Sequence, residues 1–187
     1  IYFRIEVFFS NLETPKCESM KIHNLSENNS LANHFLAELR DVEVQSDAMR
    51  FRRNLERLGE IMAYEMSKQM EYEKRKVTSP LGQLDIPCIA EDIVIATVLR
   101  AGLPFHQGFL HYFDRASNAF VSAYRDYKSP TDFDVHVEYI ATPDLSGKTL
   151  ILCDPMLATG NSMHLAYEAL IKYGTPASLY IAGVVAS

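Results

Sequence analysis

The stretch from Thr149 to Ser162 places a carboxylate directly before a run of small residues, a pattern suited to binding phosphate. Asp154 ends a short apolar run, and the small or hydroxyl-bearing residues after it are Ala158, Thr159, Gly160 and Ser162. Small residues let the backbone pass close to a bound group, and the free N–H groups at a helix start attract an anion. The hydroxyl groups can donate further hydrogen bonds. These residues therefore predict an anion-binding loop beside a carboxylate.

Two arginines also follow apolar runs that are predicted to be strands. Arg100 comes directly after Ile93 to Leu99, a run typical of a parallel strand buried on both faces. Arg125 follows a second run, Phe120 to Tyr124. Residues at the carboxyl ends of parallel strands line the edge at which open α/β sheets bind ligands, and guanidinium groups suit anionic ligands. The alternative for Arg100 is an exposed arginine in an ordinary strand-to-helix turn.

Two other kinds of phosphate loop are excluded by their missing glycines. A Walker A loop needs Gly-x4-Gly-Lys-Ser/Thr, and although Gly147-Lys148-Thr149 ends in this way, the residue five before Gly147 is Thr142. The dinucleotide fingerprint Gly-x-Gly-x-x-Gly occurs nowhere in the sequence. The loop is therefore not predicted to bind NAD or FAD on a Rossmann platform.

The segment Asp154-Pro155-Met156-Leu157-Ala158-Thr159-Gly160 resembles the loop that binds 5-phosphoribosyl diphosphate (PRPP) in type I phosphoribosyltransferases. Most members of that superfamily carry two adjacent acids here, whereas a single acid before proline resembles the uracil phosphoribosyltransferase version. Leu99-Arg100-Ala101-Gly102 and Tyr124-Arg125 resemble the diphosphate-binding segments of the same family. Asn161 departs from its more usual glycine, but asparagine tolerates left-handed backbone angles, so we expect the loop shape to be kept. The resemblance runs from about Met20 to Ser187.

This resemblance implies the reaction of uracil with PRPP to give UMP and diphosphate, as part of pyrimidine salvage. It implies catalytic roles for Asp154, which would favour positive charge on the sugar, and for Arg125. The implied PRPP-binding residues are Arg100, Ala101, Gly102, Arg125, Asp154, Pro155, Met156, Leu157, Ala158, Thr159, Gly160, Asn161 and Ser162. Mg²⁺ is the implied cofactor, held mainly by substrate oxygens rather than by protein ligands. GTP binding is implied as well, without residues to assign to it.

The base-recognition segment of the resembled family, Tyr-Ile-x-Pro-Gly-Leu-Gly-Asp, is absent from these 187 residues. No uracil-binding residue is therefore predicted in this chain, and we expect the sheet edge next to Leu179 to Val185 to expose apolar surface. Two alternatives stay open. One is a regulator of the same fold that senses PRPP and binds RNA or DNA, and the other is a phosphoribosyltransferase for another nucleobase.

Composition favours a single folded domain that binds neither nucleic acid nor membrane. The chain has 48% hydrophobic and 22% charged residues and a net charge of −6, so a polyanion would need a local cationic pocket. Its three cysteines are far apart and suggest reduced thiols rather than disulfides. The longest strongly apolar run, Ile93 to Leu99, is far shorter than the roughly 18 residues of a membrane span. We therefore expect a cytosolic protein.

Strands alternating with helices predict an α/β fold: a parallel sheet with helices on both faces, a β-hairpin arm and a flap. Residues 20–187 are the predicted phosphoribosyltransferase domain, and residues 1–19 are interpreted as an extension upstream of the natural start. The alternative is a genuine additional strand. Lys76 to Ser79 and Gln83 to Cys88 predict the hairpin. The resemblance implies that this arm forms a homodimer or higher homo-oligomer. Asp126 to Ile140 predict the flap, and Leu179 to Val185 a last parallel strand.

Three helices precede the phosphate loop in this prediction. The first covers Asn28 to Leu39, and the second, the longest, starts after Ser46 as its N-cap. Its predicted core face comprises Phe51, Leu55, Leu58, Met62 and Met66, and its other face, with Arg50, Arg52, Arg53 and Arg57, is interpreted as solvated rather than as a second anion site. The third helix begins at Pro104. Its His106 and His111 are five residues apart, off the i, i+4 spacing of helical metal ligands, so both are interpreted as structural.

Overall fold

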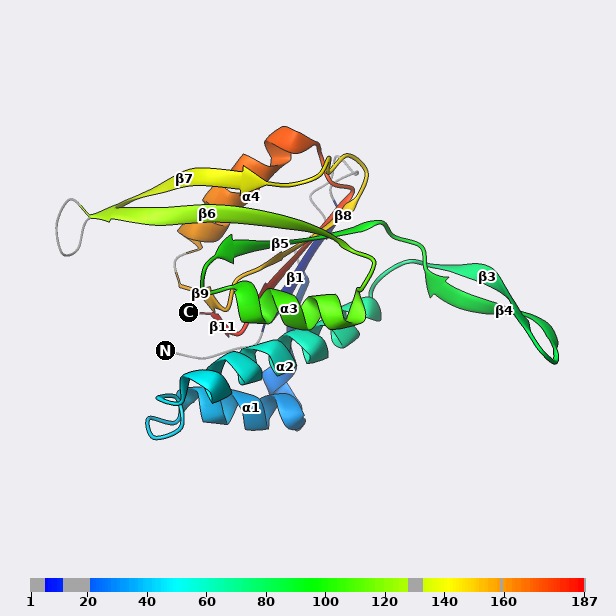
Figure 1. Ribbon diagram of the computed structural model, residues 1–187, viewed down its shortest axis with the longest axis horizontal. Coiled ribbons are helices and arrows are strands. Elements are labelled where there is room, and N and C mark those ends of the chain that lie inside the picture. Colours follow the sequence, from blue (N-terminus) through cyan, green and yellow to red (C-terminus); the bar gives the residue numbers. More distant parts are fainter. Residues whose placement is uncertain (1–5, 12–20, 128–132, 159, 187) are drawn as a thin grey trace.

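A computed structural model describes the backbone of residues 6–11, 21–127, 133–158 and 160–186, and the side chains of residues 22–122, 138–158 and 160–186. Its central sheet has seven strands in the order β2-β1-β10-β8-β5-β6-β7 (Figure 1). The four inner strands β10, β8, β5 and β6 are parallel, and the outer strands pair antiparallel. The strands are β1 Glu6–Asn11, β2 Lys21–Asn24, β5 Ile93–Leu99, β6 Ser117–Tyr127, β7 Phe133–Ala141, β8 Thr149–Cys153 and β10 Ser178–Gly183. The predicted α/β class is confirmed.

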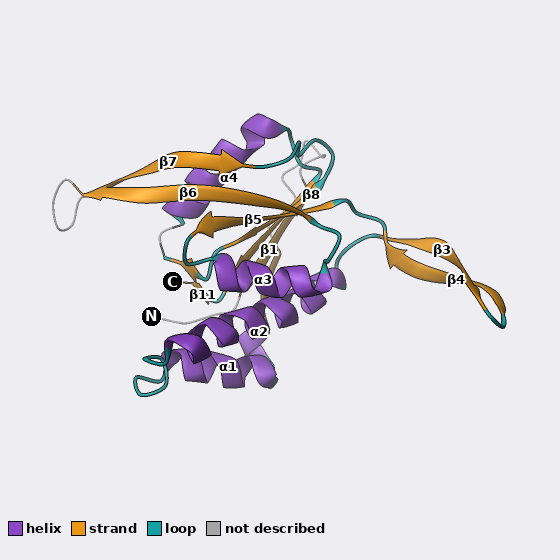
Figure 2. Cartoon of the chain, in the orientation of Figure 1, coloured by secondary structure: helices purple, strands orange, loops and turns teal. Residues whose placement is uncertain are grey.

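Helices cover both faces of this sheet (Figure 2). They are α1 Leu31–Arg40, α2 Ala48–Ser67, α3 Leu103–Tyr112 and α4 Asn161–Leu170, with short 3₁₀ turns at Leu25–Glu27 and Ile171–Tyr173. Alternate residues of β8 separate the two layers: Ile151 and Cys153 join the core beneath α1, α2 and α3, whereas Leu150 and Leu152 join the core beneath α4. Because both faces are buried, the strand sequences are continuously apolar.

The helix starts differ in detail from the prediction. Helix α1 begins after Ser30, whose side chain accepts a hydrogen bond from the Ala32 N–H. Helix α2 is capped by Asp47 rather than by Ser46, because the Asp47 carboxylate accepts from the N–H groups of Met49 and Arg50. The expected core face is buried except at Phe51, which is exposed one turn from the helix start.

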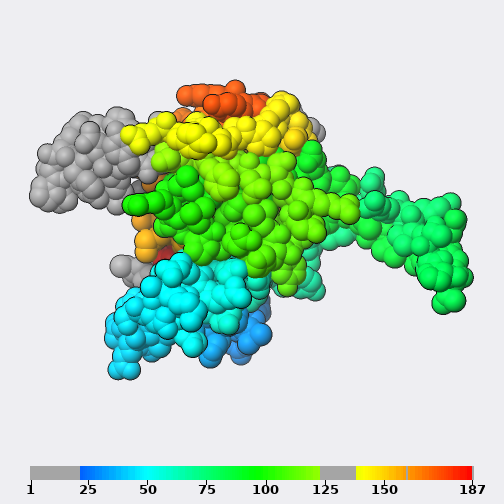
Figure 3. All heavy atoms as spheres, in the orientation of Figure 1, coloured from blue at the N-terminus to red at the C-terminus, as the bar shows by residue number. Residues whose placement is uncertain are grey.

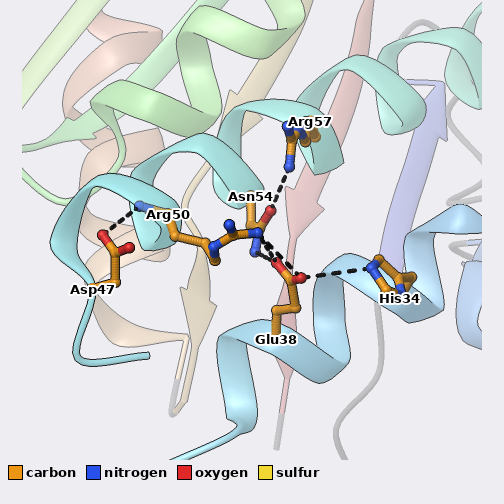
Figure 4. Close-up of polar contacts among 6 residues, drawn as sticks. All are labelled: His34, Glu38, Asp47, Arg50, Asn54 and Arg57. Carbon is orange, nitrogen blue, oxygen red and sulfur yellow. Dashed lines mark hydrogen bonds and ion pairs between the residues drawn. The ribbon is translucent and has the colours of Figure 1, made fainter. Parts of the chain in front are cut away.

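A polar network joins α1 to α2 (Figure 4). Glu38 accepts hydrogen bonds from buried Asn54 at 2.7 Å and from Arg50 at 3.4 Å. The hydrogen bond from Asn54 is the main cause that lowers the pKa of Glu38. Arg57 donates to Asn54 at 3.1 Å and lies over the ring of Phe35. Much of the arginine face of α2 therefore serves packing between the two helices.

The predicted hairpin is present and longer than expected. Strands β3 Tyr72–Ser79 and β4 Gly82–Ile89 pair antiparallel as a separate two-stranded sheet. This hairpin extends away from the rest of the molecule (Figures 1 and 3). Its exposed apolar side chains are Tyr72, Leu81, Leu84 and Ile86.

Part of the segment expected to be an extension belongs to the sheet. Residues 6–11 form β1, which pairs antiparallel with β10 from Glu6 opposite Gly183 to Asn11 opposite Ser178. This matches the alternative of an additional strand; residues 1–5 and 12–19 lie outside the described residues. The expected exposed edge beside Leu179 to Val185 is wrong over this length, because β1 supplies the backbone partners of β10.

None of the described helices is long and apolar enough to cross a membrane.

Candidate functional site

Two neighbouring strands bring Arg100 and Asp154 to the same edge of the sheet. Strands β5 and β8 pair in parallel, with Thr97 opposite Cys153 at their carboxyl ends. The buried Thr97 hydroxyl donates a 2.9 Å hydrogen bond to the Cys153 carbonyl, and the Cys153 thiol donates to the Ala96 carbonyl at 3.2 Å. These contacts fix the ends of both strands, so the loops that leave them start side by side.

The turn after β5 is packed tightly around Gly102. A Cβ atom at this position would lie 2.0 Å from Thr97 Oγ1 and 2.9 Å from the Val98 carbonyl oxygen, so the turn requires glycine. The Gly102 carbonyl accepts from the His106 N–H at 2.9 Å and thereby starts α3. Arg100 is exposed, and its guanidinium has no carboxylate partner among the described residues. It is therefore available to an anionic ligand.

The loop after β8 is held by the neighbouring strand. The Asp154 N–H donates to the Ala182 carbonyl, and Asp154 Oδ1 accepts from the Met156 N–H at 3.1 Å. Strand β9, Met156–Leu157, then pairs in parallel with β11, Val185–Ala186. Close packing continues at Gly183, where a Cβ atom would lie 2.5 Å from Leu157 Cδ1. The Asp154 carboxylate is thus positioned at the sheet edge while remaining partly accessible.

Gly160 turns the chain into α4. Its φ of 77° and ψ of −9° are left-handed, and no side chain caps the helix. The helix begins at Asn161, and the N–H groups of a first helical turn have no carbonyl acceptor within the helix itself. Asn161 was expected to need left-handed tolerance, but among the described residues only glycines have positive φ. Thr159 lies outside the described residues.

Most predicted site residues lie at the surface of this edge. The exposed ones are Arg100, Ala101, Met156, Ala158, Gly160 and Asn161, the partly buried ones are Asp154, Pro155, Leu157 and Ser162, and Gly102 is buried. The oriented N–H groups of α4, the Ser162 hydroxyl and the exposed Arg100 favour anion binding, while Asp154 adds one negative charge.

Arg125 lies in the strand next to β5, but its side chain is outside the described residues. Leu99 pairs with Ser122, so the Arg125 backbone lies three residues beyond the end of β5. There β6 and β7 form a hairpin that extends past the sheet (Figure 1). It corresponds to the predicted flap, although β6 is longer than the expected Phe120 to Tyr124. Residues 128–132 at its turn lie outside the described residues.

The buried titratable groups near this edge are not suited to chemistry. His106 is buried, its Nε2 lies 3.3 Å from the Ile95 carbonyl oxygen, and burial lowers its pKa. Burial raises the pKa of the Cys153 thiol to about 12, so a nucleophilic thiolate is disfavoured at neutral pH. The structural interpretation of His106 agrees with these contacts.

A mostly parallel sheet with helices on both faces, with a small-residue loop between strand and helix at its carboxyl edge, defines the fold of the type I phosphoribosyltransferases. The model of the family described as uracil phosphoribosyltransferase matches residues 26–187. The chain belongs to this uracil phosphoribosyltransferase family.

Curated relatives and a solved structure agree with this assignment. A Porphyromonas gingivalis protein named uracil phosphoribosyltransferase is 55% identical over 168 residues, which are 90% of this chain and 78% of the relative. A Pyrococcus furiosus protein of the same name is 39% identical over 155 residues, covering 81% of this chain and 65% of the relative. The structure of the AQ2163 protein from Aquifex aeolicus is similar with a TM-score of 0.68 and 30% identity, covering 78% of this chain and 68% of that one.

Sequence reasoning identified the two loops but missed the contacts that align them. Thr97 lies within an apolar run. Because threonine is common in strands, its neighbours in the sequence give no sign that its hydroxyl makes a specific hydrogen bond. The one available signal was a polar hydroxyl in a strand predicted to be buried on both faces, since such a group needs a hydrogen-bond partner.

Proposed function

We propose that this protein is a cytosolic pyrimidine-salvage enzyme that transfers the 5-phosphoribosyl group of PRPP to uracil, giving UMP and diphosphate. The observation that carries the proposal is the juxtaposition of the Asp154 loop and the Arg100 turn at one sheet edge, fixed by the Thr97–Cys153 hydrogen bond. Membership of the uracil phosphoribosyltransferase family supports uracil as the base.

The 5′-phosphate of PRPP binds at the start of α4 in this proposal. Gly160 opens the helix without a side-chain cap, backbone N–H groups at a helix start bind phosphate oxygens, and the Ser162 hydroxyl adds a donor. The left-handed angles of Gly160 bring the backbone round to the ligand. Binding far from the breaking bond orients the sugar and so contributes to catalysis.

The diphosphate leaving group binds at the ends of β5 and β6. Arg100 supplies one guanidinium and Arg125 the second, and such planar groups bind diphosphate oxygens through paired hydrogen bonds. Their charge favours departure of the negatively charged group. A closed β6–β7 hairpin would also exclude water from the reacting carbon.

Asp154 faces the ribose in this proposal. Its carboxylate would accept hydrogen bonds from the sugar hydroxyls and stabilise the positive charge that develops on the ring as the bond to diphosphate lengthens. Its backbone N–H donates to the Ala182 carbonyl of β10 and its Oδ1 accepts from the Met156 N–H, so the charge is held in position before the substrate binds.

The residues present fit a magnesium ion that is bound mainly by the substrate. Among the described residues, the three side chains that could together hold a metal ion, Glu56, Glu60 and His111, lie on α2 and α3. Asp154 is not one of them, so no cluster of protein carboxylates surrounds the proposed Mg²⁺ position. Mg²⁺ would neutralise part of the diphosphate charge when bound with PRPP, keeping several water ligands.

The arm β3–β4 is the proposed contact for a homodimer or larger homo-oligomer. An isolated two-stranded hairpin is marginally stable in water, and this one exposes apolar side chains along its length. Pairing with a second copy would cover them. Gel filtration with light scattering tests this, and a concentration-independent monomer would contradict it.

A radiolabelled-nucleobase assay on the complete gene product tests the reaction. Uracil with PRPP and Mg²⁺ should yield labelled UMP, and unlabelled uracil should compete better than purines. Turnover of a purine instead would show that the enzyme uses another nucleobase. A gel shift of transcript leader RNA without any turnover would show that the protein is a regulator.

A further inference from the structure

Three potential metal ligands meet where α2 crosses α3. Glu56 and Glu60 are four residues apart on α2, so their side chains project from one face of that helix. His111 lies in the last turn of α3, at the opposite end from Gly102. Its Nδ1 lies 2.7 Å from Glu60 Oε1, and its Nε2 lies 3.5 Å from Glu56 Oε1. One imidazole therefore faces a carboxylate at each of its ring nitrogens.

The backbones that carry these ligands are locked together by two glycines. A Cβ atom on Gly108 would lie 2.1 Å from the Glu56 carbonyl oxygen, and one on Gly59 would lie 2.4 Å from the Phe105 carbonyl oxygen. The helices thus touch backbone to backbone at the crossing. Because neither helix can shift without losing this contact, the ligand set needs only side-chain rotation to assemble.

The spacing of the ligand atoms suits a single small cation. Two atoms bound to one tetrahedral Zn²⁺ at its usual bond lengths are about 3.4 Å apart. One ligand atom from each of Glu56, Glu60 and His111 lies within 4.8 Å of the others, so rotation of a partly exposed glutamate closes the difference. The His111 side chain is 39% exposed and that of Glu60 32%, which leaves room for water to complete the coordination.

The donor types at this cluster favour a transition metal. Arg53 Nη1 lies 2.5 Å from Glu56 Oε2, the oxygen that does not face His111, and so orients the carboxylate as an outer hydrogen-bond partner commonly does. An imidazole nitrogen suits Zn²⁺ and its neighbours in the first transition series, whereas Mg²⁺ and Ca²⁺ take oxygen ligands.

We propose that Glu56, Glu60 and His111 form a Zn²⁺ site that joins α2 to α3, separate from the phosphoribosyl-transfer site. One ring nitrogen of His111 and one carboxylate oxygen from each glutamate would bind the metal, and water completes its coordination. Helical spacing alone favoured a structural role for His111, because its partners come from a different helix. The proposal does not depend on the function assigned to the Asp154 loop.

Calorimetric titration of metal-free protein with Zn²⁺, in the absence of PRPP, tests the site. One equivalent should bind to the wild type, and His111→Gln and Glu60→Gln should each weaken binding at least about tenfold, the loss seen even for outer-shell partners. His164→Gln is the matched control, since it removes an exposed histidine paired at i, i+4 with Glu168 at 3.4 Å. The control should bind as the wild type does.

Two further readouts separate a metal site from a simple ion-pair cluster. Co²⁺ should give visible absorption that is lost in Glu60→Gln, a variant of nearly unchanged size, and Zn²⁺ should raise the thermal unfolding temperature of the wild type but not of that variant. Excess Mg²⁺ should not compete. Wild-type affinity equal to that of Glu60→Gln, or equal competition by Mg²⁺, would overturn the proposal and leave an ion-pair cluster.

Discussion

Replacing Gly102 by alanine probes how closely the diphosphate turn is built against β5. The added Cβ atom would lie 2.0 Å from Thr97 Oγ1 and 2.9 Å from the Val98 carbonyl oxygen, both far inside van der Waals contact. Thr97 is buried, and its hydroxyl donates to the Cys153 carbonyl at 2.9 Å, so it cannot turn aside without losing that bond. The substitution must therefore displace either the turn or the contact between β5 and β8.

The expected cost follows from these two routes. Overpacking a well-packed site costs about 1–3 kcal/mol, and loss of the Thr97 hydrogen bond costs about 1 kcal/mol. We therefore expect Gly102→Ala to lower the free energy of unfolding by about 2–3 kcal/mol, measured by denaturant titration. PRPP affinity, measured by calorimetry with Mg²⁺, should fall as well, because Arg100 belongs to the same turn.

A double variant isolates the steric cause. Thr97→Ala removes the hydroxyl that the new Cβ atom meets, although the contact with the Val98 carbonyl oxygen remains. The combination of Thr97→Ala with Gly102→Ala should thus be less destabilised than the sum of the single variants, by at least about 1 kcal/mol. Additive effects, or a single Gly102→Ala variant within about 0.5 kcal/mol of the wild type, would refute this reasoning.

Three further predictions concern single side chains. Asp154→Asn should lower transfer by the complete gene product on the order of 10²-fold, because a preorganised charge facing the developing cation is lost; a loss below about fivefold at saturating PRPP would argue against this role. Arg125→Ala should weaken PRPP binding and reduce its salt dependence, and unchanged affinity in calorimetry would remove Arg125 from the site. Burial lowers the pKa of His106 in the folded state. The contribution of neutral His106 to the free energy of unfolding is therefore fully present above pH 6.5, the ordinary pKa, and is lost as the pH falls from 6.5 toward the folded-state pKa. His106→Gln should flatten this loss in denaturant titrations at several pH values, and an unchanged slope would contradict it.

The strands that lie within the parallel sheet could be located from sequence alone. Ile93–Leu99 and Thr149–Cys153 are buried on both faces, which makes each a continuous apolar run with sharp polar borders. Strand β6 was predicted too short at both ends: its first residues, from Ser117, pair with β5, and its last residues, up to Tyr127, pair with β7. The pairing of β1 with β10 was left open for a different reason, because it joins residues that are far apart in the sequence.

The residues of the candidate site were recognisable, but their supports were not. The loop from Asp154 to Ser162 carries its chemistry in a local pattern, and so does the turn at Arg100. The Thr97–Cys153 hydrogen bond joins residues 56 positions apart, and His111 meets Glu60 across 51 positions. Such contacts arise from how strands and helices pack, and no local spacing encodes them.

The most direct test of the account is to map phosphate binding on the backbone by NMR. Ribose 5-phosphate titrated into ¹⁵N-labelled protein should shift the amide signals of Gly160, Asn161 and Ser162 most strongly, because these N–H groups are proposed to hold the 5′-phosphate. PRPP with Mg²⁺ should add shifts at Arg100 and Ala101. Saturable shifts confined to other parts of the chain, with Gly160 to Ser162 unaffected, would contradict the assignment of this loop as the phosphoribosyl site.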